Sequence, residues 1–216
     1  MTLLDLQNAT LNVLGDSITQ GAGASDYNHC YVKTLETMYG FREVRNYGIG
    51  GTRIARRTVP YDPVYDQDFC QRAPLMDPNT DAVLVFGGVN DFGHGDAPIG
   101  VMSDRTPYTF YGACHTLMHF LVTHYIGKPV AFVTPLRCLN EEGNPDEGRP
   151  PLIAFRNVLL EVAFYYSLPV LDLYATSGIR PDIPEIQERL LPDGLHPSNE
   201  GHAIIARRIG EFLRTL

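Results

Sequence analysis

Five short apolar segments, each followed by glycine, proline or a polar turn, set the pattern of this 216-residue chain. They cover residues 11–14, 43–46, 82–86, 130–134 and 170–173. Runs this short and continuous are typical of strands that are buried on both faces, as in a parallel sheet. The pattern therefore predicts five parallel strands.

Between these segments, hydrophobic residues recur every three or four positions, which is the spacing of one helix face. The spacing predicts helices over residues 110–125, 152–166 and 205–216, and a weaker helix over residues 31–38. Ser198 suits the N-cap of the last helix. Strand followed by helix, five times over, predicts right-handed crossovers and a flavodoxin-like, three-layer α/β/α sandwich with a central five-stranded parallel sheet.

Size and composition fit a single domain over residues 1–216. With 44% hydrophobic and 19% charged residues, the chain can bury a substantial core. The formal net charge of -8 argues against nucleic acid or an anionic membrane as the main partner, because either would need a basic surface. We therefore expect no nucleic-acid binding and no stable membrane association.

Cysteine spacing and the N-terminal sequence bear on cofactors and location. Cys30, Cys70, Cys114 and Cys138 form no Cys-x-x-Cys pair, so no zinc or redox motif is written here and we expect no metal and no cofactor. The first seven residues lack a basic n-region and are interrupted by Asp5, unlike a signal peptide. No later stretch is long and apolar enough to span a bilayer. These features predict a cytoplasmic protein with reduced thiols.

Polar and glycine residues follow the first three predicted strands directly. Ser17 comes after the first strand, Gly51 after the second and Asn90 after the third. Ligands of open α/β sheets bind at the carboxyl ends of the strands, so these residues should gather at one edge. The loops long enough to shape a pocket there cover residues 53–80, 92–107 and 138–151.

A serine and a histidine motif can together supply a nucleophile and its base. Ser17 ends Gly-Asp-Ser where a helix should begin, so its backbone N–H could face a bound carbonyl. Asp193 lies three residues before His196, and Pro197 biases this pair toward a tight turn rather than a helix. Taken alone, either motif is also typical of an ordinary turn or helix cap.

Two further motifs can supply hydrogen-bond donors to a developing oxyanion. The backbone N–H of Gly51 and the side-chain N–H of Asn90 would join the N–H of Ser17 in this role. Gly48 and Gly50 compete with Gly51 for it. Each motif alone is equally compatible with a strand-ending turn or a loop cap.

Together, the four blocks resemble the SGNH hydrolase superfamily, also called GDSL esterases and lipases. The blocks read Gly-Asp-Ser-Ile-Thr, Asn-Tyr-Gly-Ile-Gly-Gly, Gly-Gly-Val-Asn-Asp and Asp-Gly-Leu-His-Pro. By this resemblance Ser17 is the nucleophile, Gly51 and Asn90 line the oxyanion hole, His196 is the general base and Asp193 orients it. The resemblance spans most of the chain, from the first block to the last.

The match leaves two points of detail. Ile18 stands where the family name has leucine, a conservative change that leaves the serine in place. Asp16 and Asp91 are alternative candidates for the acid that orients the base, but the spacing from Asp193 to His196 fits the family better.

The resemblance implies a serine esterase that hydrolyses carboxylic acyl esters through an acyl-enzyme intermediate. The expected partner is a small-molecule acyl ester, first a short-chain or acetyl ester, including esters of carbohydrates. A thioesterase or lysophospholipase on the same site stays open, as does a homo-oligomer.

Two hypotheses from other functional classes compete with the esterase hypothesis. A flavodoxin-like protein could bind phosphate or a nucleotide with the same glycine turns, but residues 48–53 lack the last glycine of the dinucleotide fingerprint. A noncatalytic relative with the same fold is the other reading. The intact set of five site residues argues against it.

Two further groups of side chains are candidates for substrate binding and for metal binding. Arg53, Arg56 and Arg57, followed by Tyr61 and Tyr65, could bind an anionic or sugar-like substrate. The alternative is a solvated loop in which these arginines pair with Asp62, Asp66 and Asp68. His115 and His119 lie four apart, a spacing that metal ligands use, yet no acidic residue accompanies them. We expect these histidines to be solvated or interfacial.

Overall fold

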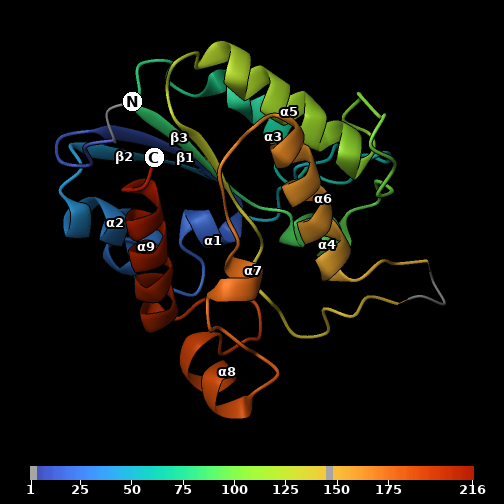
Figure 1. Ribbon diagram of the computed structural model, residues 1–216. Coiled ribbons are helices and arrows are strands. Elements are labelled where there is room, and N and C mark those ends of the chain that lie inside the picture. Colours follow the sequence, from blue (N-terminus) through green and yellow to red (C-terminus); the bar gives the residue numbers. More distant parts are fainter. Residues whose placement is uncertain (1–3, 145–147) are drawn as a thin grey trace.

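The computed structural model describes residues 4–144 and 148–216. Its centre is a five-stranded sheet in which every neighbouring pair is parallel and the strand order is β2-β1-β3-β4-β5 (Figure 1). The strands are β1 (Thr10–Gly15), β2 (Glu43–Gly48), β3 (Ala82–Phe86), β4 (Val130–Val133) and β5 (Val170–Leu171). The predicted parallel α/β arrangement is confirmed.

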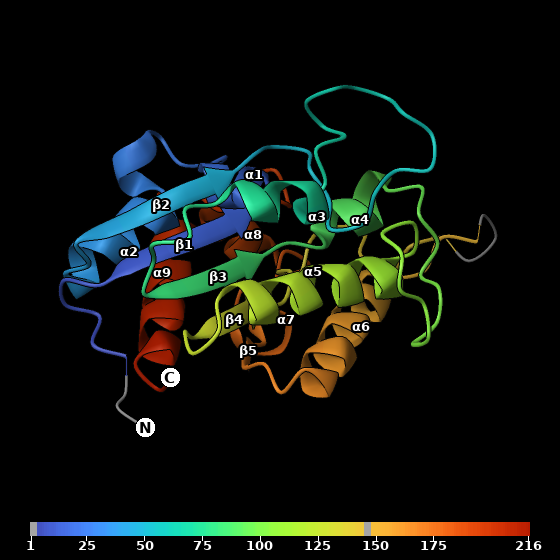
Figure 2. The ribbon, with the colours of Figure 1, turned by 90° about the horizontal axis from the view of Figure 1, so that it is seen from above.

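Helices cover both faces of the sheet, as Figures 1 and 2 show from two directions. One layer holds α1 (Ser17–Gln20), α2 (Tyr31–Tyr39) and α9 (Asn199–Leu213). The other holds α3 (Phe69–Arg72), α4 (Val89–His94), α5 (Phe110–His124) and α6 (Leu152–Tyr165). The remaining short helices are η1 (Tyr27–His29), η2 (Ala73–Leu75), α7 (Leu173–Thr176) and α8 (Pro184–Leu190).

Two hydrophobic cores form because successive side chains of a strand point to opposite faces. In β1, Leu11 and Val13 join the core beneath α2 and α9, whereas Leu14 joins the core beneath α5 and α6. All six residues of β1 are buried. This is why the strand reads as a continuous apolar run rather than as an alternating one.

Several boundaries differ from those that the sequence predicts. The segment expected as a strand over residues 170–173 is a strand only at Val170–Leu171, because Asp172 accepts a hydrogen bond from the N–H of Ala175 and begins α7. The loop expected over residues 53–80 contains α3 and η2. The last helix begins at Asn199, with Ser198 confirmed as its N-cap, and it ends at Leu213, short of the expected Leu216.

The cysteines are all free thiols. Cys30, Cys114 and Cys138 are buried and Cys70 is partly exposed. Within residues 4–144 and 148–216, none of the helices combines the length and apolar character needed to cross a bilayer.

Candidate active site

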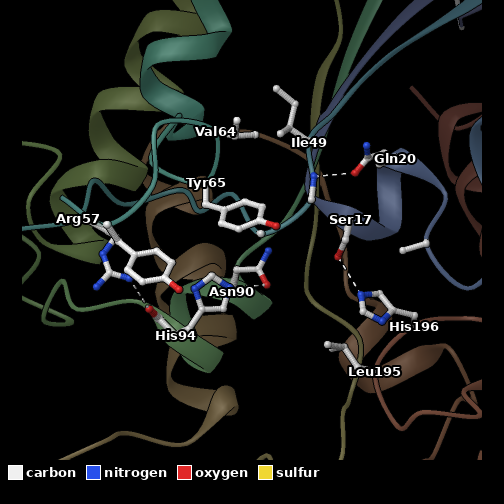
Figure 3. A pocket seen from close by; sticks show the side chains of 14 residues that line it. Ser17, Gln20, Ile49, Arg57, Val64, Tyr65, Asn90, His94, Leu195 and His196 are labelled. Atoms are coloured by element: carbon white, nitrogen blue, oxygen red, sulfur yellow. Dashed lines mark hydrogen bonds between the residues drawn. The ribbon is translucent and has the colours of Figure 1, made fainter. Parts of the chain in front are cut away.

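A cavity of about 870 Å³ opens at the carboxyl ends of β1, β2 and β3 (Figure 3). Its wall includes Ser17, Gly51, Asn90 and His196, four residues that come from four separate parts of the chain. The sequence predicted that residues following successive strands would gather at this edge. The structure brings them together there.

Ser17 is the first residue of α1, directly after β1. Asp16 caps this helix and accepts a hydrogen bond of 3.0 Å from the N–H of Ile18. The N–H groups of the first helical turn have no intrahelical partner, and that of Ser17 has no other partner among the residues that the structure describes, so it is available at the cavity wall. The turn is tight, because a Cβ added at Gly15 would lie 1.9 Å from the Thr19 hydroxyl oxygen.

His196 and Asp193 complete a chain of contacts from Ser17. The Ser17 Oγ lies 3.0 Å from His196 Nε2, and His196 Nδ1 lies 2.7 Å from Asp193 Oδ2. The other carboxylate oxygen accepts the backbone N–H groups of Leu195 and His196. Both residues lie in a turn before α9, as Pro197 predicted. The three side chains meet the geometric requirement for moving a proton from a hydroxyl to an imidazole.

The charge on Asp193 is favoured by these contacts. Partial burial raises the pKa of its carboxyl, but the hydrogen bonds from the backbone and ring of His196 and from Leu195 outweigh burial and hold the pKa below its ordinary value. An ionised carboxylate at this position can only accept, so it keeps the Nδ1 proton on the imidazole.

The other candidate acids lie elsewhere. Asp16 caps α1, and Asp91 accepts backbone N–H groups from Ile54 and Ala55 at 2.9 and 2.8 Å. Burial raises the pKa of Asp16 to about 7 and that of Asp91 to about 6. The carboxylate that contacts His196 is therefore that of Asp193.

Three neighbouring glycines compete in sequence for one donor role, and the structure separates them. A Cβ at Gly48 would lie 2.3 Å from the backbone nitrogen of Gln20, so this glycine serves close packing of β2 on α1. The N–H of Gly50 donates to Gln20 Oε1 at 2.8 Å. The N–H of Gly51 has no partner among the described residues, and its φ of +73° suits glycine. Gly51 is thus the glycine whose N–H stays available at the cavity.

Asn90 lies in the first turn of α4, which follows β3. Its amide nitrogen donates to the carbonyl oxygen of Thr52 at 2.9 Å, and its amide oxygen lies 3.2 Å from His94 Nε2. An amide nitrogen carries two hydrogens, so one remains for a ligand in the cavity. Ser17, Gly51 and Asn90 together offer three N–H donors at the wall.

Arg72 of α3 ties the first two blocks to each other, a role that the sequence analysis missed. Its guanidinium donates to the carbonyl oxygens of Gly15 and Tyr47 at 2.9 and 2.6 Å and to the Thr52 hydroxyl at 2.8 Å. Burial lowers the pKa of this guanidinium to about 10. No sequence motif predicts these contacts, because most of their acceptors are backbone carbonyls, which every residue has.

The loop expected to contact substrate is placed only in part as predicted. Tyr61 and Tyr65 line the cavity. Arg53 does not: its side chain is 2% exposed and pairs with Asp66 at 3.0 Å, behind the wall. The expected substrate contact of Arg53 is therefore wrong, whereas Arg57, another of the three arginines named for this role, does line the cavity. Pairing with aspartate, the alternative interpretation, describes Arg53 correctly.

The two α5 histidines that the sequence spacing singled out, His115 and His119, lie in different environments. His115 is buried, with its ring against those of Tyr165 and Tyr166, so of the two predicted environments it has the interfacial one and not the solvated one. His119 is exposed, as expected. In the part of the chain that the structure describes, no group of three or more His, Cys, Asp or Glu side chains is arranged to hold a metal ion.

Comparison with known proteins identifies the family of this chain. Residues 13–204 match the model of the GDSL-like Lipase/Acylhydrolase family. No curated protein matches the chain significantly. One crystal structure is 32% identical, with a TM-score of 0.84, and the match covers 99% of both chains.

Two further solved structures are similar over nearly the whole of this chain. A protein from Lactobacillus plantarum is 28% identical, with a TM-score of 0.83, and the match covers 97% of this chain and 98% of that one. A two-domain esterase active on acetylated mannans is 23% identical, with a TM-score of 0.66. That match covers 96% of this chain and 48% of the esterase.

Proposed function

Because this chain belongs to the GDSL-like lipase/acylhydrolase family, we propose that it is a serine esterase that hydrolyses carboxylic acyl esters through an acyl-enzyme intermediate. The observation that carries the proposal is the contact of 3.0 Å between Ser17 Oγ and His196 Nε2. An imidazole at this distance can accept the hydroxyl proton as the oxygen attacks a carbonyl carbon.

The proposed reaction has two steps. Ser17 Oγ attacks the ester carbonyl while His196 Nε2 takes its proton, and the same proton leaves on the alcohol as the C–O bond breaks. A water molecule, deprotonated by His196, then attacks the acyl-enzyme, and the proton returns to Ser17 as the acid departs. The N–H groups of Ser17, Gly51 and Asn90 stabilise the oxyanion in both steps, and Asp193 holds the imidazole in the required tautomer.

The competing phosphate-binding function has less support. A phosphate cradle needs several free backbone N–H groups in one glycine loop. In this loop the N–H of Gly48 donates to the Asn46 side chain and that of Gly50 to Gln20. Counting partners within residues 4–144 and 148–216, Gly51 is the one residue of 48–51 whose N–H has none, which fits a single oxyanion contact better than a phosphate.

For the substrate, we propose a short-chain or acetyl ester, with carbohydrate esters included. The apolar side chains of Ile49, Val64 and Leu195 line the cavity and suit a small acyl group. Tyr61 and Arg57 offer an aromatic face and donors for a polyol leaving group. The fold similarity to an esterase active on acetylated mannans is consistent with this proposal.

The direct test is hydrolysis of p-nitrophenyl acetate by the wild type, Ser17→Ala and a matched control, Ser103→Ala. Ser103 is exposed, and within the described part of the chain its hydroxyl makes no hydrogen bond, so its removal should change nothing. We expect Ser17→Ala to lose roughly 10⁴-fold or more in kcat, because no other group supplies the nucleophile. A folded Ser17→Ala variant with the wild-type rate would contradict the proposal.

The substrate class needs its own test. Acetyl, butyryl and octanoyl esters of p-nitrophenol, an acetylated manno-oligosaccharide, an acetyl thioester and a lysophospholipid should be compared by kcat/KM. We expect the acetyl and butyryl oxygen esters to be the best substrates. A maximum at the octanoyl ester, the thioester or the lysophospholipid would overturn the substrate proposal while leaving the serine esterase mechanism in place.

A further inference from the structure

We propose that His94 and Arg53 are positioning residues that fix the orientation of the Asn90 amide, so that its free N–H points at the oxyanion. This inference rests on the proposed esterase function. The sequence analysis predicted that Arg53 binds substrate, and it gave His94 no role. Neither touches the reacting atoms, because each acts through Asn90.

An asparagine in an oxyanion hole has an orientation problem. The two ends of its amide are nearly equal in shape, but only the nitrogen can donate to an oxyanion, and the oxygen would repel it. In the observed orientation, Asn90 Nδ2 donates to the Thr52 carbonyl at 2.9 Å and Oδ1 lies 3.2 Å from His94 Nε2. A flipped amide would set oxygen against the Thr52 carbonyl and nitrogen against the ring. Both hydrogen bonds, to the Thr52 carbonyl and from His94, therefore favour the observed orientation, provided that His94 Nε2 carries a hydrogen.

Arg53 ensures that Nε2 carries that hydrogen. Its Nη1 lies 3.2 Å from His94 Nδ1, and a guanidinium can only donate hydrogen bonds. Nδ1 must therefore accept, so the single proton of the neutral imidazole resides on Nε2. This N–H then donates to Asn90 Oδ1.

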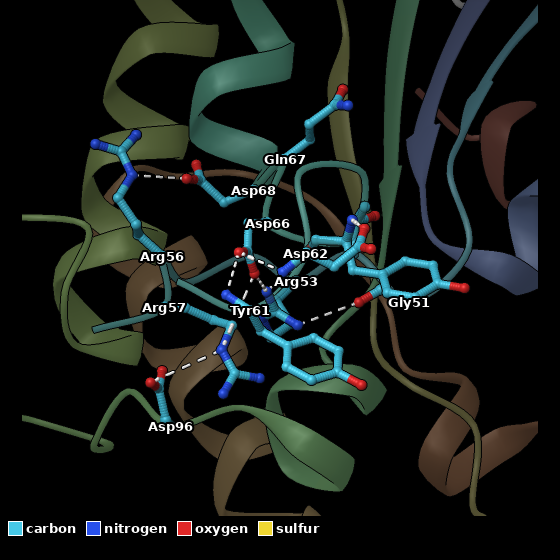
Figure 4. Close-up of polar contacts among 12 residues, drawn as sticks. Gly51, Arg53, Arg56, Arg57, Tyr61, Asp62, Asp66, Gln67, Asp68 and Asp96 are labelled. Atoms are coloured by element: carbon cyan, nitrogen blue, oxygen red, sulfur yellow. Dashed lines mark hydrogen bonds and ion pairs between the residues drawn. The ribbon is translucent and has the colours of Figure 1, made fainter. Parts of the chain in front are cut away.

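Both terminal nitrogens of the guanidinium are themselves held by hydrogen bonds (Figure 4). Arg53 Nη2 donates to the Tyr65 carbonyl at 2.9 Å and to Asp66 Oδ1 at 3.0 Å, and Nη1 also reaches the Gly51 carbonyl at 3.3 Å. One buried arginine thus contacts the backbone of Gly51 directly and the amide of Asn90 through His94. Two of the three oxyanion donors are held by the same side chain.

The charges around His94 favour the neutral ring that this arrangement needs. Burial of part of the ring and the positive charges of Arg53 and Arg57 lower the pKa of His94. The carboxylates nearby are already committed: Asp66 pairs with Arg53, and Asp96 lies 3.8 Å from Arg57. A second proton on Nδ1 would also face the N–H of Arg53. His94 is on helix α4, four residues after Asn90 and therefore on the same helix face.

His94 also lines the cavity and is exposed there, so a direct substrate contact is the rival interpretation (Figure 3). Both ring nitrogens, however, are already engaged, one by Asn90 and the other by Arg53. The ring therefore offers a substrate only its carbon face. A positioning role predicts an effect on kcat that disappears once Asn90 is removed, whereas a substrate contact predicts an independent effect on KM.

A double-mutant cycle on p-nitrophenyl acetate separates the two roles. We expect Asn90→Ala to lower kcat by about 10² to 10³, as for other oxyanion donors, and His94→Phe to lower it by about tenfold with KM nearly unchanged. The double variant should match Asn90→Ala alone, because His94 then has nothing to orient. Effects of the two changes that multiply in the double variant, or an unaltered His94→Phe, would overturn the proposal. Since His94 is exposed, its replacement should leave the fold intact.

A conservative replacement and a spectroscopic measurement complete the test. His94→Gln can accept from Arg53 through its oxygen and donate to Asn90 through its nitrogen, so it should retain more activity than His94→Phe. Nitrogen-15 NMR of the wild type should show His94 as the neutral Nε2–H tautomer. An Nδ1–H tautomer would overturn the proposal even in an active esterase. Conversely, an Nε2–H tautomer in a protein without any esterase activity would refute the proposed function and leave the His94 arrangement standing.

Discussion

Ser17 Oγ and His196 Nε2 lie 3.0 Å apart although 179 positions separate them in the sequence. Contacts between the loop after α1 and the start of α9 hold them together. The buried ring of His202 accepts the Tyr31 N–H through Nδ1 and lies 3.1 Å from the Ala22 carbonyl through Nε2. The N–H of Ser25 donates to the Asn199 side chain at 2.8 Å. The serine and the histidine are therefore positioned by hydrogen bonds between side chains of α9 and the backbone of residues 22–31.

Replacing Asp193 with asparagine tests the carboxylate without disturbing the turn. Asparagine can still accept the N–H groups of Leu195 and His196 through one oxygen, but its amide nitrogen would face His196 Nδ1. The imidazole would then favour the tautomer whose proton is on Nε2, which cannot accept from Ser17. We expect kcat to fall by roughly 10³ to 10⁴ with an unchanged melting temperature. A rate near that of the wild type would remove Asp193 from the mechanism.

Asp16 should make folding stability depend on pH. Burial, with a smaller contribution from the charge of Asp91, raises the pKa of Asp16 from 3.8 to about 7 in the folded chain. Between these values the folded state keeps a proton that the unfolded state has released, so the free energy of unfolding falls as the pH rises from 3.8 toward about 7. The contribution of this one group is up to about 4 kcal/mol.

The isosteric variant Asp16→Asn removes that dependence, and asparagine is an equally good N-cap. Denaturant unfolding of both proteins between pH 4 and pH 8 should show the variant gaining stability relative to the wild type as the pH rises. A stability difference that stays constant across this range would show that Asp16 ionises normally.

Arg72 should be essential to both stability and the site. Its replacement by methionine leaves the carbonyls of Gly15 and Tyr47 without this donor, and we expect the free energy of unfolding to fall by about 3 kcal/mol or more. Because these carbonyls precede Ser17 and the oxyanion glycine, kcat should fall as well. The control is Arg189→Met, which removes an exposed pair with Glu200 and should cost about 1 kcal/mol or less. Equal effects of the two replacements on stability would contradict the role of Arg72.

Strands and helices could be predicted from the sequence wherever the hydrophobic pattern extends over enough residues to be recognised. The five apolar runs and the helices that became α5, α6 and α9 were predicted, because each buries a continuous face. The four-residue α3 was not, since its formation depends on the single cap of Asp68. The strand expected over residues 170–173 was too long because Asp172 begins a helix.

The site divides in the same way. Ser17, Gly51 and Asn90 were predicted from their motifs and their places after strands, and His196 from its motif before the last helix; the structure gathers all four in one cavity. The residues that hold these four in place could not be predicted from the sequence. Arg72 and His202 form hydrogen bonds mainly with backbone groups that are distant in sequence. Every residue type has such backbone groups, so the sequence does not indicate which of them a side chain will contact. Arg53 was misplaced for the same reason, because an arginine in a loop gives no indication of whether it faces solvent or the carbonyls beneath.

The most direct measurement of the central claim is covalent labelling by a fluorophosphonate, with the modified peptide identified by mass spectrometry. If Ser17 is the nucleophile activated by His196, the wild type should carry one adduct, on Ser17, and His196→Ala should label far more slowly. Ser103→Ala should label like the wild type and Ser17→Ala not at all. An adduct on any other residue, or labelling of Ser17 at the same rate without His196, would contradict the account.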